Sequence, residues 1–104
     1  MVIYSDVAIQ DLEDILYGLV TWKKHPLAVE HALQYVDELH ADADTICLKF
    51  YHANTTYLLH QKYGNKAHTY KRNVQTQWYV IYEWMNYQRV ALVNKILNNY
   101  QTEI

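Results

Sequence analysis

Apolar side chains recur every three or four residues in the first part of the chain, the spacing that places them on one face of a helix. Ser5 precedes this pattern and can accept hydrogen bonds from the first free amide groups of a helix, while Asp6 suits the positive end of the helix dipole. The pattern predicts a helix from about Asp6 to about Thr21, after a short strand at residues 2–4. Its apolar face consists of Ala8, Leu12, Ile15, Leu16 and Leu19.

A second helical pattern follows a turn at residues 23–26. Pro26 suits the first position of a helix, where its missing N–H leaves no bond unmade. The pattern predicts a helix that begins at Pro26 and fades near residues 41–44, and the two helices are expected to form a hairpin that is acidic outside and apolar inside. Its apolar face consists of Ala28, Ala32, Tyr35, Val36 and Leu39.

From Thr45 onward the helical spacing is lost and β-prone residues become frequent. Residues 46–50 are predicted to be a strand or a buried extended segment, and residues 55–60 form a second β-prone segment. Gly64 and Asn65 predict a turn. Residues 67–73 are then expected to form a strand.

The longest apolar run lies at residues 78–84, where both alternating faces carry apolar or aromatic side chains. Such a strand is expected in the centre of a sheet that is covered on both sides. Residues 85–88 predict a hairpin turn, and residues 89–97 are expected to return antiparallel. The predicted fold is therefore α+β: a short N-terminal strand and a two-helix hairpin packed on an antiparallel sheet of three to four further strands.

Length and composition predict a single domain over residues 1–104, because half of the residues are hydrophobic while glycine and proline are scarce. The sequence contains neither a signal-peptide pattern nor an apolar run of the roughly 18 residues that a membrane span needs. The single Cys47 has no partner for an internal disulfide. These features predict a cytoplasmic protein without membrane contact.

Charge is segregated along the chain. Residues 1–44 carry nine acidic and two basic side chains, whereas residues 45–82 carry five basic side chains and no acidic one. This division favours a surface that faces a polyanion. Acidic helices that pack beside a basic sheet and compensate its charge explain it equally well.

The basic segment contains the candidates for nucleic-acid binding. Basic side chains bind phosphates, and Tyr70 and Tyr79 lie beside the charge, where they could stack on bases. A solvated basic edge strand and aromatic packing are the alternatives. The nucleic-acid-binding candidates are Lys62, Lys66, Tyr70, Lys71 and Arg72.

Three histidines, His52, His60 and His68, are spaced by eight residues, which can put them on one face of an unbroken strand. A zinc site needs three such ligands and a fourth group, but the turn at Gly64 interrupts any common strand. No nucleotide-binding loop or zinc-protease pattern appears. The sequence therefore predicts neither a metal nor a cofactor, although one of these histidines could act as a general base.

Four segments together resemble the RelE/ParE superfamily of bacterial toxins, in particular a subgroup found in Bacteroides-type bacteria. Residues 3–12 are similar to the family's first strand and first helix, and the segment around Ala28 to its second helix. Residues 78–82 (Trp-Tyr-Val-Ile-Tyr) are similar to its aromatic central strand, and residues 95–99 (Lys-Ile-Leu-Asn-Asn) to the end of its last strand. The resemblance covers nearly the whole chain.

The resemblance implies the toxin of a type II toxin–antitoxin pair that inhibits translation by cutting messenger RNA in the ribosome and is neutralised by an antitoxin protein. Members of the ParE branch instead poison DNA gyrase without cutting RNA, and a degenerate, non-toxic member is a third interpretation. Tyr79 replaces the arginine that the family places in the central strand, and asparagines replace the cations after the last strand. The candidate catalytic set is His68, Lys71, Arg72, Tyr79, Lys95 and Tyr100.

Overall fold

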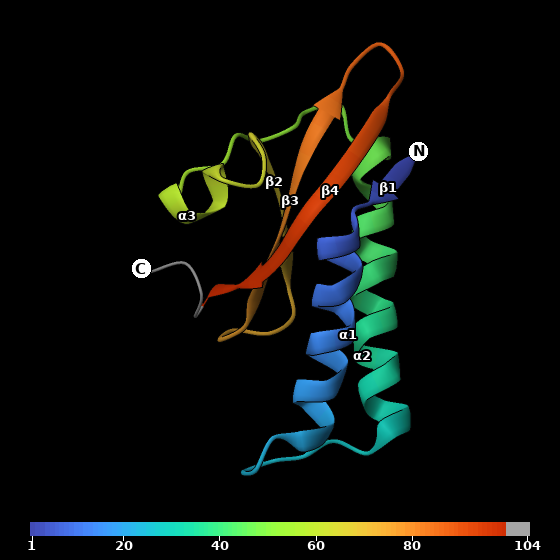
Figure 1. The fold of residues 1–104 in the computed structure, drawn as a ribbon, viewed down its shortest axis with the longest axis vertical. Coiled ribbons are helices and arrows are strands. Elements are labelled where there is room, and N and C mark those ends of the chain that lie inside the picture. The colour runs from blue at the N-terminus through green and yellow to red at the C-terminus, as the bar shows by residue number, and fades with distance from the viewer. Residues whose placement is uncertain (100–104) are drawn as a thin grey trace.

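A four-stranded sheet with a helical hairpin along one face forms the framework of the protein (Figure 1). The computed structural model describes residues 1–99 and has the predicted α+β fold. Among these residues no helix has the length and apolar character needed to cross a membrane. The elements are β1 (Val2–Tyr4), α1 (Asp6–Thr21), α2 (Val29–Ala43), the 3₁₀ helix η1 (Asp44–Leu48), α3 (Leu58–Gln61), β2 (Lys66–Lys71), β3 (Gln77–Met85) and β4 (Val90–Asn98).

The strands lie in the order β1-β4-β3-β2, so that β3 is an inner strand as predicted. β3 runs antiparallel to both β2 and β4, and β1 runs parallel to β4, with Val2 beside Ala91. The register between β3 and β4 shifts at Ile81 and Tyr82. This irregularity leaves Asn94 as an extra residue in β4 and keeps the apolar residues on both sides of it on the helix-covered face.

The predicted first helix is confirmed, including its cap, because the Ser5 hydroxyl accepts a hydrogen bond from the Ala8 amide at 3.2 Å. The predicted start of the second helix is wrong: α2 begins at Val29, not at Pro26. The amide of Leu27 donates to the carbonyl of Leu19 in α1 at 3.0 Å. This bond holds the connection against the end of α1 and delays the start of α2.

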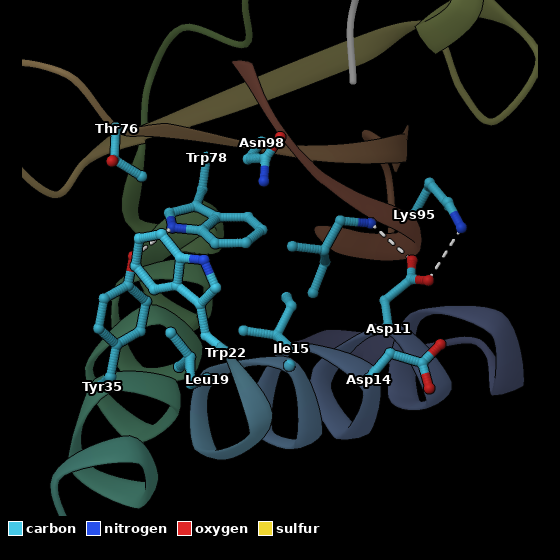
Figure 2. A pocket seen from close by; sticks show the side chains of 12 residues that line it. Asp11, Asp14, Ile15, Leu19, Trp22, Tyr35, Thr76, Trp78, Lys95 and Asn98 are labelled. Carbon is cyan, nitrogen blue, oxygen red and sulfur yellow. Dashed lines mark hydrogen bonds and ion pairs between the residues drawn. The ribbon is translucent and has the colours of Figure 1, made fainter. Parts of the chain in front are cut away.

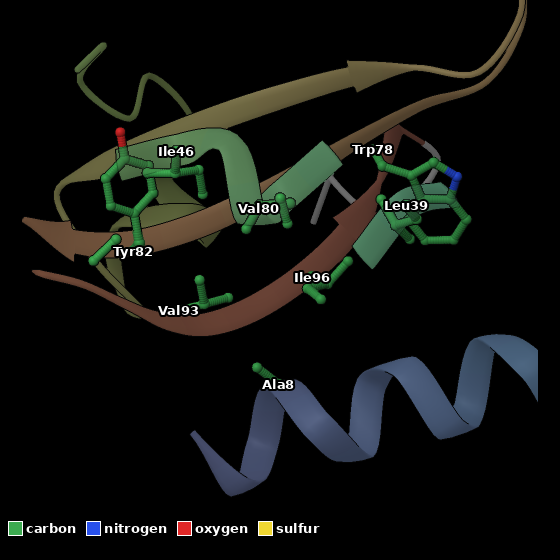
Figure 3. Packing of buried hydrophobic residues seen from close by; sticks show 10 residues of the cluster. Ala8, Leu39, Ile46, Trp78, Val80, Tyr82, Val93 and Ile96 are labelled. Carbon is green, nitrogen blue, oxygen red and sulfur yellow. The ribbon is translucent and has the colours of Figure 1, made fainter. Parts of the chain in front are cut away.

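The core lies between the helical hairpin and the sheet (Figure 3). Alternation along β3 turns Trp78, Val80 and Tyr82 towards the helices, where Ala8 and Leu39 are fully buried. On the opposite face Ile81 is also fully buried, but Glu83 is exposed. The prediction of a strand covered on both sides is therefore correct for only part of β3.

The connection between α2 and β2 differs most from the prediction. Residues 46–50, predicted to be extended, lie mainly in η1, which places Ile46 in the core and leaves Phe50 fully exposed. Residues 55–60, predicted to be β-prone, run into α3, because His60 packs beneath Tyr79 and this tertiary contact overrides β propensity.

The turn around Gly64 is present and has a steric cause. A Cβ atom at this position would lie 2.6 Å from the backbone oxygen of Tyr82, so only glycine fits so close to β3. β2 begins one residue earlier than predicted and ends at Lys71, because the amides of Arg72 and Asn73 turn to the carbonyl of Thr76. The β3–β4 turn also takes in Arg89, the one non-glycine residue of the described chain with a positive φ, of 51°.

Candidate functional site

The six candidate catalytic residues do not form one site. Strand alternation places His68 on the helix-covered face of the sheet, and Lys71 and Tyr79 on the opposite face. Arg72 turns towards α2, and Lys95 reaches α1. Tyr100 lies outside the described residues. The expectation of one convergent set is therefore wrong for the five residues that the structure describes.

His68 is buried and held by an acid. Its Nε2 lies 2.6 Å from Oδ2 of Asp42, near the end of α2, while its Nδ1 has no hydrogen-bond partner among the described residues. Burial lowers the pKa of His68, although the bond to Asp42 acts in the opposite direction. The ring is therefore neutral near pH 7 and is enclosed by protein rather than facing a substrate.

Arg72 is also engaged within the protein. Its guanidinium bonds the carboxylate of Glu38 and the hydroxyl of Tyr70, and it lies 4.2 Å from the ring centre of Tyr35. The bond from Arg72 lowers the pKa of Glu38, so this pair stays charged at neutral pH. Tyr70, which was expected to stack on a base, is therefore part of an internal contact between α2 and the end of β2.

Lys95 and Asp11 close an open edge of the sheet. β1 ends at Tyr4, and beyond it Oδ2 of Asp11 accepts the backbone amide of Ile96 at 2.9 Å. Oδ1 of the same carboxylate lies 2.9 Å from Nζ of Lys95. Asp11 thus provides on α1 the acceptor that a longer β1 would have provided, which explains a buried acid on an otherwise apolar helix face.

Lys71 and Tyr79 occupy the face of the sheet opposite the hairpin. Lys71 is exposed and stands opposite Gln77, two residues from Tyr79 along β3. The ring of Tyr79 contacts Tyr57 and His60, with centroid separations of 5.7 and 4.9 Å. Burial raises the pKa of Tyr79, so its hydroxyl keeps its proton at neutral pH.

The basic side chains that do gather lie at the other end of the sheet and were mostly missed by sequence reasoning. The ring of His52 stacks on Trp84 at 3.9 Å, and its Nδ1 lies 2.6 Å from the hydroxyl of Tyr82. Burial lowers the pKa of His52, and three nearby cations lower it further. These cations are Lys49, Lys66 and Arg89.

We call Lys49, His52, Lys66, Trp84 and Arg89 the His52 cluster. Nζ of Lys66 donates to Asn54 at 2.7 Å, which holds it beside the 49–54 segment. The guanidinium of Arg89 lies 5.5 Å from the ring of Trp84. Of the nucleic-acid-binding candidates only Lys66 belongs to this cluster, and His52 was considered only as a metal ligand or general base. The signal available in the sequence was the acid-free run Lys49-Phe50-Tyr51-His52.

A cleft of about 530 Å³ opens between α1 and the ends of β3 and β4 (Figure 2). Its floor is apolar, and Trp22 is half exposed at one side. Asp14 and the Asp11–Lys95 pair lie at the far end. Gly18 also faces the cleft, where an added Cβ would meet no atom within 4 Å. The apolar floor consists of Ile15, Leu19, Tyr35, Trp78 and Ile96.

The three histidines considered as metal ligands have separate surroundings. His52 lies on Trp84, His60 lies beneath Tyr79, and His68 bonds Asp42. Within residues 1–99 no three His, Cys, Asp or Glu side chains are grouped so that they could hold a metal ion.

No protein-family model, curated protein or solved structure matches the chain.

Proposed function

We propose that this chain is the toxin of a type II toxin–antitoxin pair of the RelE/ParE class, and that it acts in the cytoplasm on messenger RNA at the ribosome. The main support is that the segments carrying the resemblance fall in successive elements of one fold. Residues 3–12 span β1 and the start of α1, and residues 78–82 form the inner strand β3. Residues 95–98 end β4, beside β3.

Ribosome-dependent cleavage would use the open face of β2 and β3. Lys71 and Tyr79 are diagonal neighbours there. The 2′-hydroxyl would attack the phosphorus and lose its proton to water as the bond to the 5′ oxygen breaks, while the Lys71 ammonium offsets charge on the phosphate. The Tyr79 hydroxyl would give its proton to the leaving 5′ oxygen, since its raised pKa keeps it protonated at neutral pH.

A second candidate function is inhibition of DNA gyrase, or of another protein, by binding alone. The three internal pairs of His68, Arg72 and Lys95 with acids of the helical hairpin favour it. A nuclease needs unpaired cations around the phosphate, but Arg72 and Lys95 are held by the fold and the buried His68 ring is neutral.

We assign the cleft between α1 and β4 to the antitoxin. Its apolar floor suits an apolar segment of a protein partner, and Asp14 at its end suits a basic residue of that segment. Gly18→Phe should fill the cleft and prevent neutralisation, so that cells producing both proteins stop growing. Gly18→Ala is the matched control and should leave neutralisation intact.

Induced production in a bacterial host tests the proposal. Growth arrest is expected, with new messenger RNA ends mapping to translating ribosomes. Intact transcripts together with DNA damage would instead support the gyrase candidate, and continued growth would support the non-toxic interpretation.

If cutting occurs, Tyr79→Phe should reduce it by about 100-fold or more, the effect of one general acid, and Lys71→Ala should also reduce it. Lys24→Ala, in the exposed α1–α2 connection, should leave it unchanged. Arg72→Ala should also reduce cutting, but only indirectly, because it removes the contact with Glu38 and destabilises the fold. Thermal unfolding of this variant must therefore be measured together with its cutting activity. Unchanged cutting by Lys71→Ala would exclude this face as the active site.

A further inference from the structure

The segment between η1 and α3 carries two exposed aromatic side chains next to a group of cations. Phe50 is fully exposed and Tyr51 is 76% exposed, and the two are flanked in sequence by Lys49 and His52. Lys49 and His52 turn towards the sheet, where His52 reaches Tyr82 and Trp84. One short segment therefore shows two rings to solvent while its basic side chains join the His52 cluster.

Packing inside the protein does not explain the two rings. An exposed phenylalanine contributes no hydrophobic stabilisation to the folded state. A single exposed phenylalanine is nevertheless common. Two adjacent exposed rings beside a cluster of cations are a more specific arrangement, since aromatic faces stack on bases while neighbouring cations bind phosphates.

Charge around the cluster is unbalanced. Lys49, Lys66 and Arg89 each act on His52, whereas Asp42 is the acid whose charge reaches Lys49. This arrangement contrasts with Arg72 and Lys95, each of which lies against its own carboxylate. The surplus positive charge of the cluster suits an anionic ligand.

The cluster is also held in place. Arg89 adopts a left-handed backbone conformation in the β3–β4 turn, and its guanidinium donates to the carbonyl of Cys47 at 2.9 Å. Residues 53–55 pair with the start of β2 through the bonds Ala67 N–H to Ala53 O and Thr55 N–H to Asn65 O. The 49–54 segment is thus fixed at both ends against the sheet, which lowers the entropy cost of binding on it.

We propose that the Phe50–Tyr51 pair and the cations of the His52 cluster form a binding site for single-stranded nucleic acid. Two bases stack on the exposed rings, and the phosphate between them and the phosphates on either side contact Lys49, Lys66 and Arg89. In the proposed function this site would be one place where the protein contacts messenger RNA, and to that extent the inference rests on the proposed function. An oligonucleotide in solution tests the site without reference to toxicity.

The experiment measures fluorescence anisotropy of a labelled, unstructured oligoribonucleotide of about 10 nucleotides, within the size range of single-strand sites. The wild-type protein should bind it, and more weakly as salt increases. Phe50→Ala and Tyr51→Ala should each weaken binding about tenfold. Lys66→Gln should weaken it and reduce the slope of log affinity against log salt by about 0.7.

Two matched controls lie away from the site. Tyr17→Ala removes a tyrosine of α1 that is 70% exposed, and Lys24→Gln removes a cation at the α1–α2 connection, at the opposite end of the molecule from the β3–β4 turn (Figure 1). Both should bind like the wild type.

No binding by the wild-type protein at low salt would overturn the proposal, as would equal losses in the ring variants and in Tyr17→Ala. Equal binding of a double-stranded RNA would also overturn it, since paired bases cannot stack on the rings. A non-toxic protein that binds the oligonucleotide would leave this site standing while the proposed function fails. A toxic protein that does not bind the oligonucleotide would overturn this site and leave the proposed function standing.

Discussion

Two groups of basic side chains in this protein differ in what surrounds them. His68, Arg72 and Lys95 each lie against a carboxylate of the helical hairpin, so the charges of Arg72 and Lys95 and the neutral ring of His68 are used to join helices and sheet. Within residues 1–99 no side chain of the His52 cluster forms such a pair, and the cluster lies beside two exposed rings. Residue type alone therefore does not separate a structural cation from one available to a ligand; the acid next to it does.

The largest effect of removing the acid next to a structural cation is expected at Asp11. Asp11→Ala leaves the Ile96 amide without its acceptor and Lys95 without its partner in a half-buried place, so we expect a loss of about 3 kcal/mol in the free energy of unfolding. Urea denaturation measures it. Asp11→Asn keeps an acceptor for the amide and should cost less; equal losses would show that the charge matters more than the edge of the sheet.

His60 is a buried basic side chain that is not paired with an acid among the described residues. It is fully buried, and neither ring nitrogen has a hydrogen-bond partner among residues 1–99. His60→Phe should therefore raise the free energy of unfolding by about 1–2 kcal/mol, since it removes an unsatisfied polar group and keeps a ring of similar shape. Thermal unfolding at pH 7.5 gives this number, and a loss of stability would contradict the assignment.

The same residue gives the protein a pH dependence. Burial lowers the pKa of His60, so the unfolded chain takes up a proton more readily than the folded one. The free energy of unfolding should have its full value above about pH 6.5, the ordinary pKa of histidine. It should fall as the pH drops towards the lower pKa that His60 has in the folded protein. Burial also lowers the pKa of His52 and His68, so His60→Phe should reduce this slope and not abolish it.

The Arg72–Glu38 contact should have a smaller effect, because it is partly exposed to solvent. Glu38→Gln should lower the free energy of unfolding by less than Asp11→Ala does, and 1 M NaCl should reduce the loss. Glu30→Gln, at an exposed position of the same helix, is the matched control. A loss as large as that of Asp11→Ala would show that this pair holds α2 to the sheet.

The smallest effect is expected at the exposed rings. Phe50→Ala should change the free energy of unfolding by less than about 0.5 kcal/mol, since the side chain is fully exposed. Chemical denaturation beside the wild type measures this. A larger loss would indicate that Phe50 packs within the protein and would remove the reason to expect a ligand there.

The helices and the three-stranded part of the sheet could be predicted because their apolar residues follow one period over many positions. The spacing from Ala8 to Leu19 defines α1, and the run from Trp78 to Trp84 defines β3. Boundaries depended on single bonds that have no periodic signal. The Leu27–Leu19 hydrogen bond, which moves the start of α2, is such a case.

The candidate site could be predicted less well, because it depends on pairs of residues far apart in the chain. Lys71 and Arg72 are neighbours in sequence, yet one is exposed and the other joins Glu38. Lys66 and Arg89 are far apart in sequence, yet both act on His52. Sequence spacing could identify an acid-free basic segment, but it could not show which acids of the hairpin would reach it.

The pairing of β1 with β4 affects the order in which the protein folds. Val2 lies beside Ala91, so β1, the first strand to leave the ribosome, cannot pair until β4 has also left it. Until then α1 and α2 have no complete sheet to cover, and their apolar faces stay open to water or to another protein. Contacts between such distant segments also slow folding. We therefore expect the sheet to close only after β4 has been synthesised.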